Sequence, residues 1–529
     1  MPSIPKEIAR EAQEIALVNI PSPPLNRFLV LPSPDYNPDG FHVIFIDSVI
    51  RDNLSAWLGQ EVVTGYSFKL SRDAELYIDN EFDGDLLHNI ERSLEERDLG
   101  LPTRFLYDSN MPAWMRKRLK SALDLSKYDM IPGARYHNFN DFFGFPRPDH
   151  RGDLVYREMT PLPHPRLERA ESVMGVMAAS DVLLSFPYQK YDYVPQLIRE
   201  AADDPRVTKI QITLYRVAKK SSVVKALLYA LEQGKQVDAF VEAKARFDEA
   251  SNLFWGKEME DAGAYVRYSY PAVKVHTKLL HILREEDGRT SHYSYIGTGN
   301  FNEKTSKLYT DHALLTCRPV LGEDVGRVFD LLRGKLILPN CKELLVAPFN
   351  MQPEFEAMIQ TEIANARAGK SAYLFLKMNS LEEPVMIRLL KKAAAAGVEC
   401  RLIVRGICRW EPSEKEKNVE IISIIDRFLE HARIFIFGNG GRERVFIGSA
   451  DWMNRNLFRR VEVVTPIDDP ALKRELRRVM DMQWRDNQRS RIIAAKGRNV
   501  YRTGEKDHTY RAQYDIYEYF AGQYAEVVG

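Results

Sequence analysis

The chain has 529 residues, and its 74 Lys and Arg balance its 74 Asp and Glu, so the formal net charge at pH 7 is +0. That balance argues against a general nucleic-acid binder, although local basic pockets remain compatible with it. The hydrophobic fraction of 45% and the charged fraction of 28% are those of a globular protein, and the length predicts roughly two to four domains.

Neither the cysteines nor the N-terminus indicates export. The four cysteines show no CxxC pairing, which argues against a disulfide framework or a zinc site. Residues 1–20 carry acidic side chains and lack the long apolar core of a signal peptide, and no apolar run approaches the ~20 residues of a membrane span. We expect a cytoplasmic protein, and leave membrane association open.

Residues 1–155 predict an α+β unit. Strand patterns at 41–50, 66–70 and 74–78 mix with helical patterns at 82–98 and 112–125. Residues 144–167, rich in proline and charge, are typical of a linker.

Strand and helix patterns then alternate, which predicts α/β units with mostly parallel sheets. "KIQITLYRV" (209–217) is followed by a helical pattern at 221–234 and by "QVDAFVEA" (236–243). Near residue 346 the pattern restarts, and one offset aligns Gly234 with Gly397 and Arg216 with Asn379. The fold class is therefore α/β and α+β multidomain, with two similar halves at 156–345 and 346–529, although one approximate repeat can arise by chance.

The stretch "VKVHTKLLHI" (273–282) contains two histidines. If it forms one strand, His276 and Lys278 share a face, and His281 lies on the other. A histidine beside a lysine suits phosphate chemistry, because imidazole can be a nucleophile and ammonium can neutralise phosphoryl oxygens. The alternative for His276 is a hydrogen-bonded core residue, and we expect His281 to be a packing residue.

A glycine-containing turn follows the histidine motif in each half. "GTGN" (297–300) follows His276, and "GSAD" (448–451) follows His431-Ala-Arg433. HxK followed by G-[ST]-x-N resembles the phospholipase D superfamily, in which two copies meet, one histidine attacks phosphorus and the other acts as acid or base. Arg433 in place of lysine and Asp451 in place of asparagine depart from the hydrolase pattern.

Longer motifs resemble polyphosphate kinase of the first type. They include "ITLYRVAKKS" (212–221), "VEAKARFDEASN" (241–252), "IGTGNFNEKTSKLYTDHALLT" (296–316) and "GSADWMNRN" (448–456). The resemblance implies a head domain at 1–155, phospholipase D-like domains at 156–345 and 346–529, and a homo-oligomer. It also implies reversible transfer of the ATP γ-phosphate to inorganic polyphosphate through a phosphohistidine. The helical domain with which the family normally opens has no counterpart here, which leaves adenine contacts and dimer geometry open.

The resemblance also implies roles for individual residues. His276 is expected to be the phosphorylated nucleophile, with Lys278 gathering phosphoryl charge. His431 matches the second family histidine, which contacts the nucleotide and assists the leaving group. Tyr309 and Arg405 match ATP-binding positions, with packing and a structural role as the respective alternatives.

Arg216 and Arg246 match family positions assigned to the Mg²⁺ site. A guanidinium has no lone pair for a cation, so these arginines more plausibly hold phosphate oxygens beside the metal. The alternative is a structural ion pair, for Arg246 with Asp248 or Glu249. The expected partners are ATP or ADP and polyphosphate, without nucleic acid. The rival functions are a phospholipase D-type phosphodiesterase and a non-catalytic nucleotide- or polyphosphate-binding protein.

Overall fold

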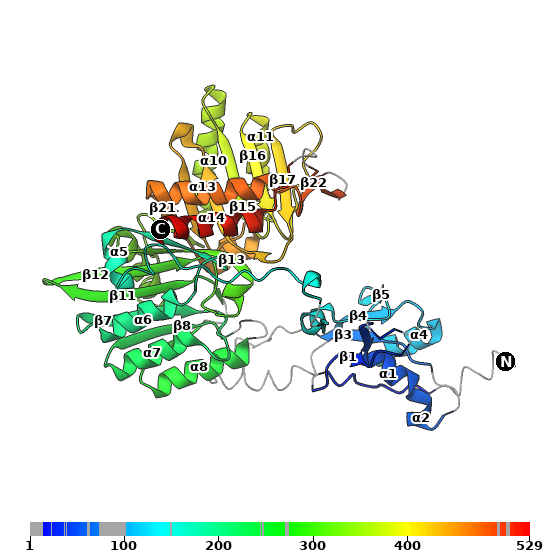
Figure 1. Ribbon diagram of the computed structural model, residues 1–529. Coiled ribbons are helices and arrows are strands. Elements are labelled where there is room, and N and C mark those ends of the chain that lie inside the picture. Colours follow the sequence, from blue (N-terminus) through cyan, green and yellow to red (C-terminus); the bar gives the residue numbers. More distant parts are fainter. Residues whose placement is uncertain are drawn as a thin grey trace. The chain divides into compact units, whose positions relative to one another are not determined.

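The computed structural model describes residues 14–22, 24–35, 37–38, 40–60, 64–72, 102–148, 151–243, 245, 248–269, 274–494, 498–503 and 508–528 (Figure 1). They fall into two compact units, one ending at Glu158 and the other continuing from Met159. The expected division into domains at 1–155, 156–345 and 346–529 stays a prediction. Among the helices that the structure describes, none combines the length and the apolar composition that a membrane crossing requires.

The first unit mixes short strands and helices, as its sequence patterns predict. Its strands are β1 (Phe28–Leu31) paired with β2 (His42–Phe45), and the sheet of β3 (Phe68–Arg72), β4 (Pro102–Asp108) and β5 (Met130–Gly133). Its helices include α1 (Ile46–Asp52), α2 (Leu54–Leu58) and α4 (Ala113–Ala122), with 3-10 turns η2 (Phe139–Gly144) and η3 (Gly152–Leu154). The strand expected at 74–78 and the helix expected at 82–98 lie outside the described residues.

The single strand expected at 41–50 is wrong beyond Phe45, because helix α1 begins at Ile46. Asp47 in the first turn of α1 is buried and forms an ion pair with Arg27, whose Nε lies 2.6 Å from its carboxylate. The helical turn directs this carboxylate inward beside Ile46, which is also buried.

The first sheet of the second unit is half parallel and half antiparallel. Its strands are β6 (Val182–Phe186), β7 (Val207–Leu214), β8 (Gln236–Val241), β9 (Tyr265–Tyr268), β11 (Leu279–Glu286), β12 (Arg289–Gly297), β13 (Tyr309–Thr316) and β18 (Leu429–Glu430). The order is β18-β13-β12-β11-β7-β8-β9, with β6 on β13. β7, β8 and β9 are parallel to one another, and the short β18 is parallel to β13. The other neighbours are antiparallel, from β7 through β11 and β12 to β13 and from β13 to β6, so the expectation of a mostly parallel sheet is wrong for that part. The cause is a hairpin whose loop residues, Asp287 and Gly288, both have positive φ (50° and 74°), as two-residue turns require.

The second sheet repeats this order. Its strands are β10 (Lys274–Val275), β14 (Leu345–Ala347), β15 (Tyr373–Met378), β16 (Glu399–Val404), β17 (Val419–Ile424), β19 (Arg433–Phe437), β20 (Arg444–Gly448), β21 (Arg460–Ile467), β22 (Ser490–Ala494) and β23 (Arg498–Tyr501). The order β10-β21-β20-β19-β15-β16-β17-β22-β23, with β14 on β21, matches the first sheet strand for strand from β21 to β17. The expected internal repeat is therefore present in the topology.

Two short strands are exchanged between the halves. β10 comes from the first half but pairs in parallel with β21, where Val275 lies opposite Val461. β18 comes from the second half but pairs in parallel with β13, where Glu430 lies opposite Thr310. Each exchanged strand directly precedes a histidine of the sequence motifs, so each histidine is carried to the other half.

The core of the second unit is built in layers. Helices α5 (Val173–Ala179), α6 (Tyr193–Asp203), α7 (Ser222–Glu232) and α8 (Glu249–Asp261) contribute to the first core, and α10 (Met351–Arg367), α11 (Pro384–Ala395) and α12 (Asn454–Phe458) to the second. A third cluster joins the remaining faces of both sheets with α9 (Pro319–Leu332) and α13 (Pro470–Arg485), and α14 (Ala512–Val528) packs beside α13.

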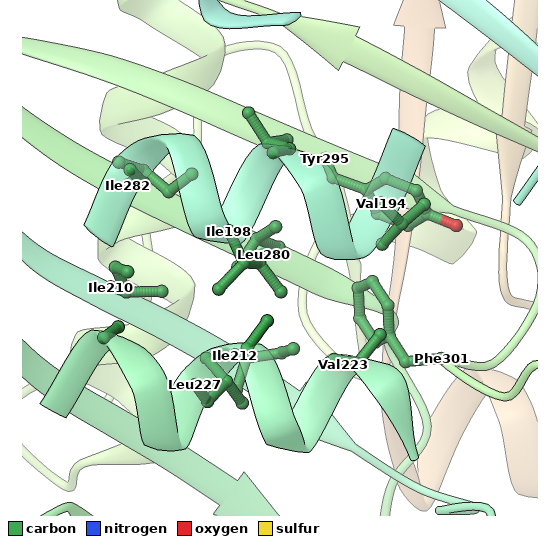
Figure 2. Packing of buried hydrophobic residues seen from close by; sticks show 14 of the residues in the cluster. Val194, Ile198, Ile210, Ile212, Val223, Leu227, Leu280, Ile282, Tyr295 and Phe301 are labelled. Carbon is green, nitrogen blue, oxygen red and sulfur yellow. The ribbon is translucent and has the colours of Figure 1, made fainter. Parts of the chain in front are cut away.

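Figure 2 shows how the first of these cores is filled. Val194 and Ile198 of α6 face side chains of β7 and β11, and Val223 and Leu227 of α7 approach them from the neighbouring helix. Complete burial of each such aliphatic side chain contributes about 1.5–3 kcal/mol. This burial stabilises the sheet and so fixes the strand ends from which the loops at its edge begin.

Candidate active site

The segment around His276 is not the single strand that the sequence suggests. β10 ends at Val275 and β11 begins at Leu279, so His276 to Lys278 lie between strands. The break is caused by the strand exchange, because the His276 amide donates to the carbonyl oxygen of Val461 in β21 at 2.9 Å. His281 sits in β11 as a buried packing residue, 3.2 Å from Gln211 Oε1, as expected.

The ring of His276 is paired with a carboxylate of the opposite half. Its Nδ1 lies 2.9 Å from Glu462 Oε2, and the residue is only 8% exposed. Glu462 is fully buried and also accepts hydrogen bonds from Ser449 Oγ at 2.5 Å and from Asn456 Nδ2 at 2.6 Å. Three donors thus hold the carboxylate in place, and it orients the imidazole. Among the described residues, no hydrogen-bond partner faces Nε2 of His276.

The electrostatics keep His276 neutral. Burial is the main cause that lowers its pKa well below the ordinary 6.5, and the positive charges of Lys278 and Arg460 lower it further. A neutral imidazole that donates from Nδ1 to a carboxylate has its lone pair on Nε2. The same burial raises the pKa of Glu462 and lowers that of Lys278 well below its usual value.

A second histidine–carboxylate pair joins the halves the other way round, with the histidine from the second half and the carboxylate from the first. His431 Nδ1 lies 2.8 Å from Asp311 Oδ1 of the first half, and Thr298 Oγ1 donates to the same oxygen at 2.5 Å. Gly299 makes this possible, because a Cβ at that position would collide with the Asp311 carboxylate. Burial lowers the pKa of His431 against the opposing effect of Asp311. The turn "GTGN" therefore supplies both a hydroxyl donor and the space for a carboxylate.

The two histidines differ in the basic residue two positions further on. The Lys278 ammonium bonds to the carbonyl of His276, and the ammonium lies 5.2 Å from the ring centre of Tyr215. Arg433 Nη1 likewise donates to the carbonyl of His431 at 2.8 Å, but it also lies 3.1 Å from Nε2 of His431, and its Nη2 pairs with Asp451 at 3.0 Å. Arg433 and Asp451, the two residues that depart from the hydrolase pattern, therefore form one buried ion pair. They also place a guanidinium against Nε2 of the second histidine, a nitrogen that is open on the first.

Arg405 and Tyr309 lie on the side of the site that contains His431. Arg405 directly follows β16, as expected for the carboxyl edge of a sheet, and its Nη2 donates to Asn379 Oδ1 at 2.8 Å. Asn379 Nδ2 in turn donates to the carbonyl of His431 at 3.2 Å. The ring of Tyr309 is centred 5.2 Å from the ring of His431. A cation and an aromatic ring thus flank the second histidine.

Of the two arginines expected near a magnesium ion, the structure describes one. Arg216 is partly exposed beyond the end of β7, with its Nε 3.5 Å from Asp248 Oδ2, and Arg246 lies outside the described residues. The described part of the chain holds no group of three or more His, Cys, Asp and Glu side chains arranged to bind a metal. The carboxylates nearest the histidines are engaged by hydrogen-bond donors, so this donor set does not form a protein cage for Mg²⁺.

Sequence reasoning missed Asp311 and Glu462. Both are two residues beyond the start of equivalent strands, β13 and β21, and both are almost completely buried. The signal was a carboxylate at matching places in "YTDHALL" and "RVEVVTP", which becomes visible only when the two strands are aligned.

Comparison with known proteins agrees with this architecture. Family profiles match in three consecutive segments, described as the polyphosphate kinase middle domain at 4–145, C-terminal domain 1 at 172–336 and C-terminal domain 2 at 344–513. The polyphosphate kinase of Vibrio cholerae is 39% identical over 511 residues, which cover 95% of this chain and 73% of that protein. The polyphosphate kinase of Escherichia coli K12 is 38% identical over 513 residues, 95% of this chain and 74% of that protein.

A solved structure gives the same result for the fold. The crystal structure of polyphosphate kinase from Porphyromonas gingivalis superimposes with a TM-score of 0.84 at 37% sequence identity, covering 96% of this chain and 75% of that one. The expected α/β and α+β multidomain fold is confirmed. The chain belongs to the polyphosphate kinase family.

Proposed function

We propose that the chain is an ATP:polyphosphate phosphotransferase that reversibly moves the γ-phosphate of ATP to inorganic polyphosphate through a phosphohistidine on His276. The observation that carries the proposal is the pair of crossed histidine–carboxylate contacts, in which only His276 has an open Nε2. Family membership supports the substrates, because the relatives are named polyphosphate kinases.

In the first step, Nε2 of neutral His276 attacks the γ-phosphorus in line with the departing ADP. The bond from phosphorus to nitrogen forms as the bond to the bridging β–γ oxygen breaks. The proton stays on Nδ1, which remains hydrogen-bonded to Glu462. Glu462 thereby stabilises the positive charge that the ring acquires. Arg216 is the cationic group proposed to gather charge on the phosphoryl oxygens, and Lys278 joins it in its protonated form, which the arriving phosphate charge favours against the lowered pKa of the buried amine.

In the second step, a terminal oxygen of polyphosphate attacks the phosphohistidine, and the phosphorus–nitrogen bond breaks. His431 and Arg405 face the leaving nucleotide in this proposal, and Tyr309 contacts its base. The reverse sequence forms ATP from ADP and polyphosphate. Mg²⁺ would be bound mainly by the substrate phosphates, with Arg216 and Arg246 holding phosphate oxygens beside it rather than ligating the ion.

The test of the proposed function uses the 529-residue chain. ATP labelled in the γ-phosphate should place acid-labile, base-stable label on the protein, and ADP with polyphosphate should yield ATP. A protein that binds ATP without exchange or labelling would be the non-catalytic alternative. Cleavage of a phosphodiester without nucleotide would favour the phosphodiesterase.

The pH dependence of labelling should reflect the lowered pKa of His276. Because the neutral ring is the nucleophile, lowering its pKa extends the active range toward acid, not toward base. The single-turnover labelling rate at saturating ATP should therefore stay within about twofold as the pH falls from about 8 to about 6. If the rate fell to half at about pH 6.5, the ordinary pKa of histidine, the result would contradict a lowered pKa for His276.

Replacing Arg405 should weaken ATP binding selectively. Loss of one charge-assisted contact to a phosphate costs about 1.5–3 kcal/mol, so Arg405→Gln should raise KM for ATP by about 10- to 100-fold. KM for polyphosphate should change little. Arg409→Gln is the matched control. Arg409 is an exposed arginine four residues after Arg405, and its Nη1 lies 3.2 Å from Glu382 Oε1. Equal effects of both variants on KM for ATP would contradict the assignment.

A further inference from the structure

A buried carboxylate directly precedes the second histidine. Glu430, the last residue of β18, is 2% exposed and accepts hydrogen bonds from four side chains. Its Oε2 receives Lys377 Nζ at 2.6 Å, Gln483 Nε2 at 2.8 Å and Thr310 Oγ1 at 2.9 Å, and its Oε1 receives Gln513 Nε2 at 2.7 Å. The donors come from β15, α13, β13 and α14, and each is at most 2% exposed.

Thr310 connects this carboxylate to the catalytic pair. Its Oγ1 donates to Glu430 and also accepts the His431 amide at 3.2 Å. The next residue of β13 is Asp311, which holds the His431 ring. A shift of β18 along β13 would therefore move the ring of His431 away from its carboxylate.

Gln513 fixes the same strand from the C-terminal helix α14. Its side-chain amide accepts from the Phe428 amide at 2.8 Å and donates to the Phe428 carbonyl at 2.9 Å, in addition to its bond to Glu430. One fully buried side chain of α14 thus contacts both residues that flank Leu429.

Among the described residues of the first half, no counterpart of this four-donor cluster is present. The residue before His276 is Val275, at the position of Glu430, and its amide is held by Glu242 at 2.9 Å from within the same half. The position of Lys377 in the first half corresponds to Leu214. Burying a charged pair costs more than an apolar contact of the same size, so the Lys377–Glu430 pair, whose positions in the first half hold Leu214 and Val275, calls for a specific role.

We propose that Glu430, Lys377, Gln483 and Gln513 form a positioning cluster that sets the register of β18 on β13 and so couples helix α14 to the placement of His431. These residues touch no substrate and act only through His431. The inference rests on the proposed function, because it assumes that His431 assists transfer to His276. Displacing a reacting group by about 1 Å can cost about 10²-fold in rate.

The first test compares two variants on α14 in the full chain. Gln513→Leu removes the contacts to Phe428 and Glu430, whereas Tyr517→Phe removes only a hydrogen bond from the same helix to the Thr160 carbonyl, which involves neither Phe428 nor Glu430. Gln513→Leu should lower the single-turnover labelling rate at saturating ATP at least about tenfold, with KM for ATP within about threefold. Tyr517→Phe should leave the rate within about twofold of wild type. Equal rates for Gln513→Leu and Tyr517→Phe would overturn the proposal.

A double variant keeps the proposal testable if Gln513→Leu does not fold. Lys377→Met with Glu430→Leu removes both charges of the buried ion pair, so that neither is left buried alone. Thr310, Gln483 and Gln513 lose their acceptor, so the melting temperature should fall. Measured below its melting temperature, where the variant is folded, the labelling rate should fall at least about tenfold, because the link from Glu430 to Thr310 is lost. A lowered melting temperature together with a wild-type rate for the folded protein would show that the cluster only supports the fold, and would overturn the proposal. If wild type itself takes no label from ATP, the proposed function fails, whatever the variants do.

Discussion

His276→Gln should abolish labelling by ATP and lower both directions of phosphoryl transfer by at least about 10⁴-fold, the scale on which a covalent mechanism loses its nucleophile. Glutamine keeps a polar side chain in the space beside Glu462, so the change removes the nucleophilic Nε2 more than the packing. Acid-labile, base-stable label after incubation with γ-labelled ATP is the direct measurement. Binding of ATP should persist, because no contact on the Arg405 side is altered.

His281→Gln is the matched control for loss of a histidine from the same stretch. His281 contacts Gln211 and His292 within the sheet and has no contact with either carboxylate of the site. Folded His281→Gln should therefore label normally. Persistent label on His276→Gln, or equal loss in both variants, would remove His276 from the role of nucleophile.

Glu462→Gln should have the second largest effect, a loss of about 10²- to 10⁴-fold in the labelling rate. The carboxylate fixes the proton of His276 on Nδ1 and stabilises the charge of the phosphorylated ring, and a neutral amide does neither as well. Ser449 donates to Oε2 and Asn456 to Oε1 of Glu462, so the single glutamine oxygen can keep only one of these two hydrogen bonds, and some loss of stability is expected. Single-turnover labelling measured alongside the melting temperature separates the chemical effect from unfolding.

Asp311→Asn makes the same change at the other histidine and serves as its counterpart. Because His431 assists the leaving group but does not form the bond to phosphorus, the rate should fall less, by about 10²-fold. A larger loss for Asp311→Asn than for Glu462→Gln would exchange the roles of the two histidines.

The repeated architecture could be predicted from the sequence because long strands and helices carry clear periodicity. Gly234 and Gly397 follow equivalent helices, Asn379 directly follows β15, and Arg216 lies two residues beyond the equivalent strand β7, as the alignment of the halves indicated. The resemblance to polyphosphate kinase rested on ordered motifs of many residues and is confirmed. The roles assigned to His276, His431, Lys278, Tyr309 and the arginines stay predictions.

The parts that could not be predicted depend on contacts between the halves. β10 and β18 contain two residues each, too few to show a period, so "VKVHTKLLHI" resembled one continuous strand. The partners of the histidines, Glu462 and Asp311, are distant in sequence and become neighbours only through the strand exchange. The antiparallel side of each sheet is formed by hairpins. The alternation of helix and strand patterns in the sequence does not reveal that a hairpin reverses the strand direction.

The strand exchange also determines what a half can do by itself. A fragment ending between the two sheets would keep His276 but lose Glu462, and the remaining fragment would keep His431 but lose Asp311. Each fragment would also present an unpaired edge on β13 or β21 where the missing two-residue strand belongs. Inactive fragments with complementary edges are suited to reassembly, and mixing them should restore labelling that neither shows alone. Each half thus supplies the carboxylate that orients the histidine of the other half.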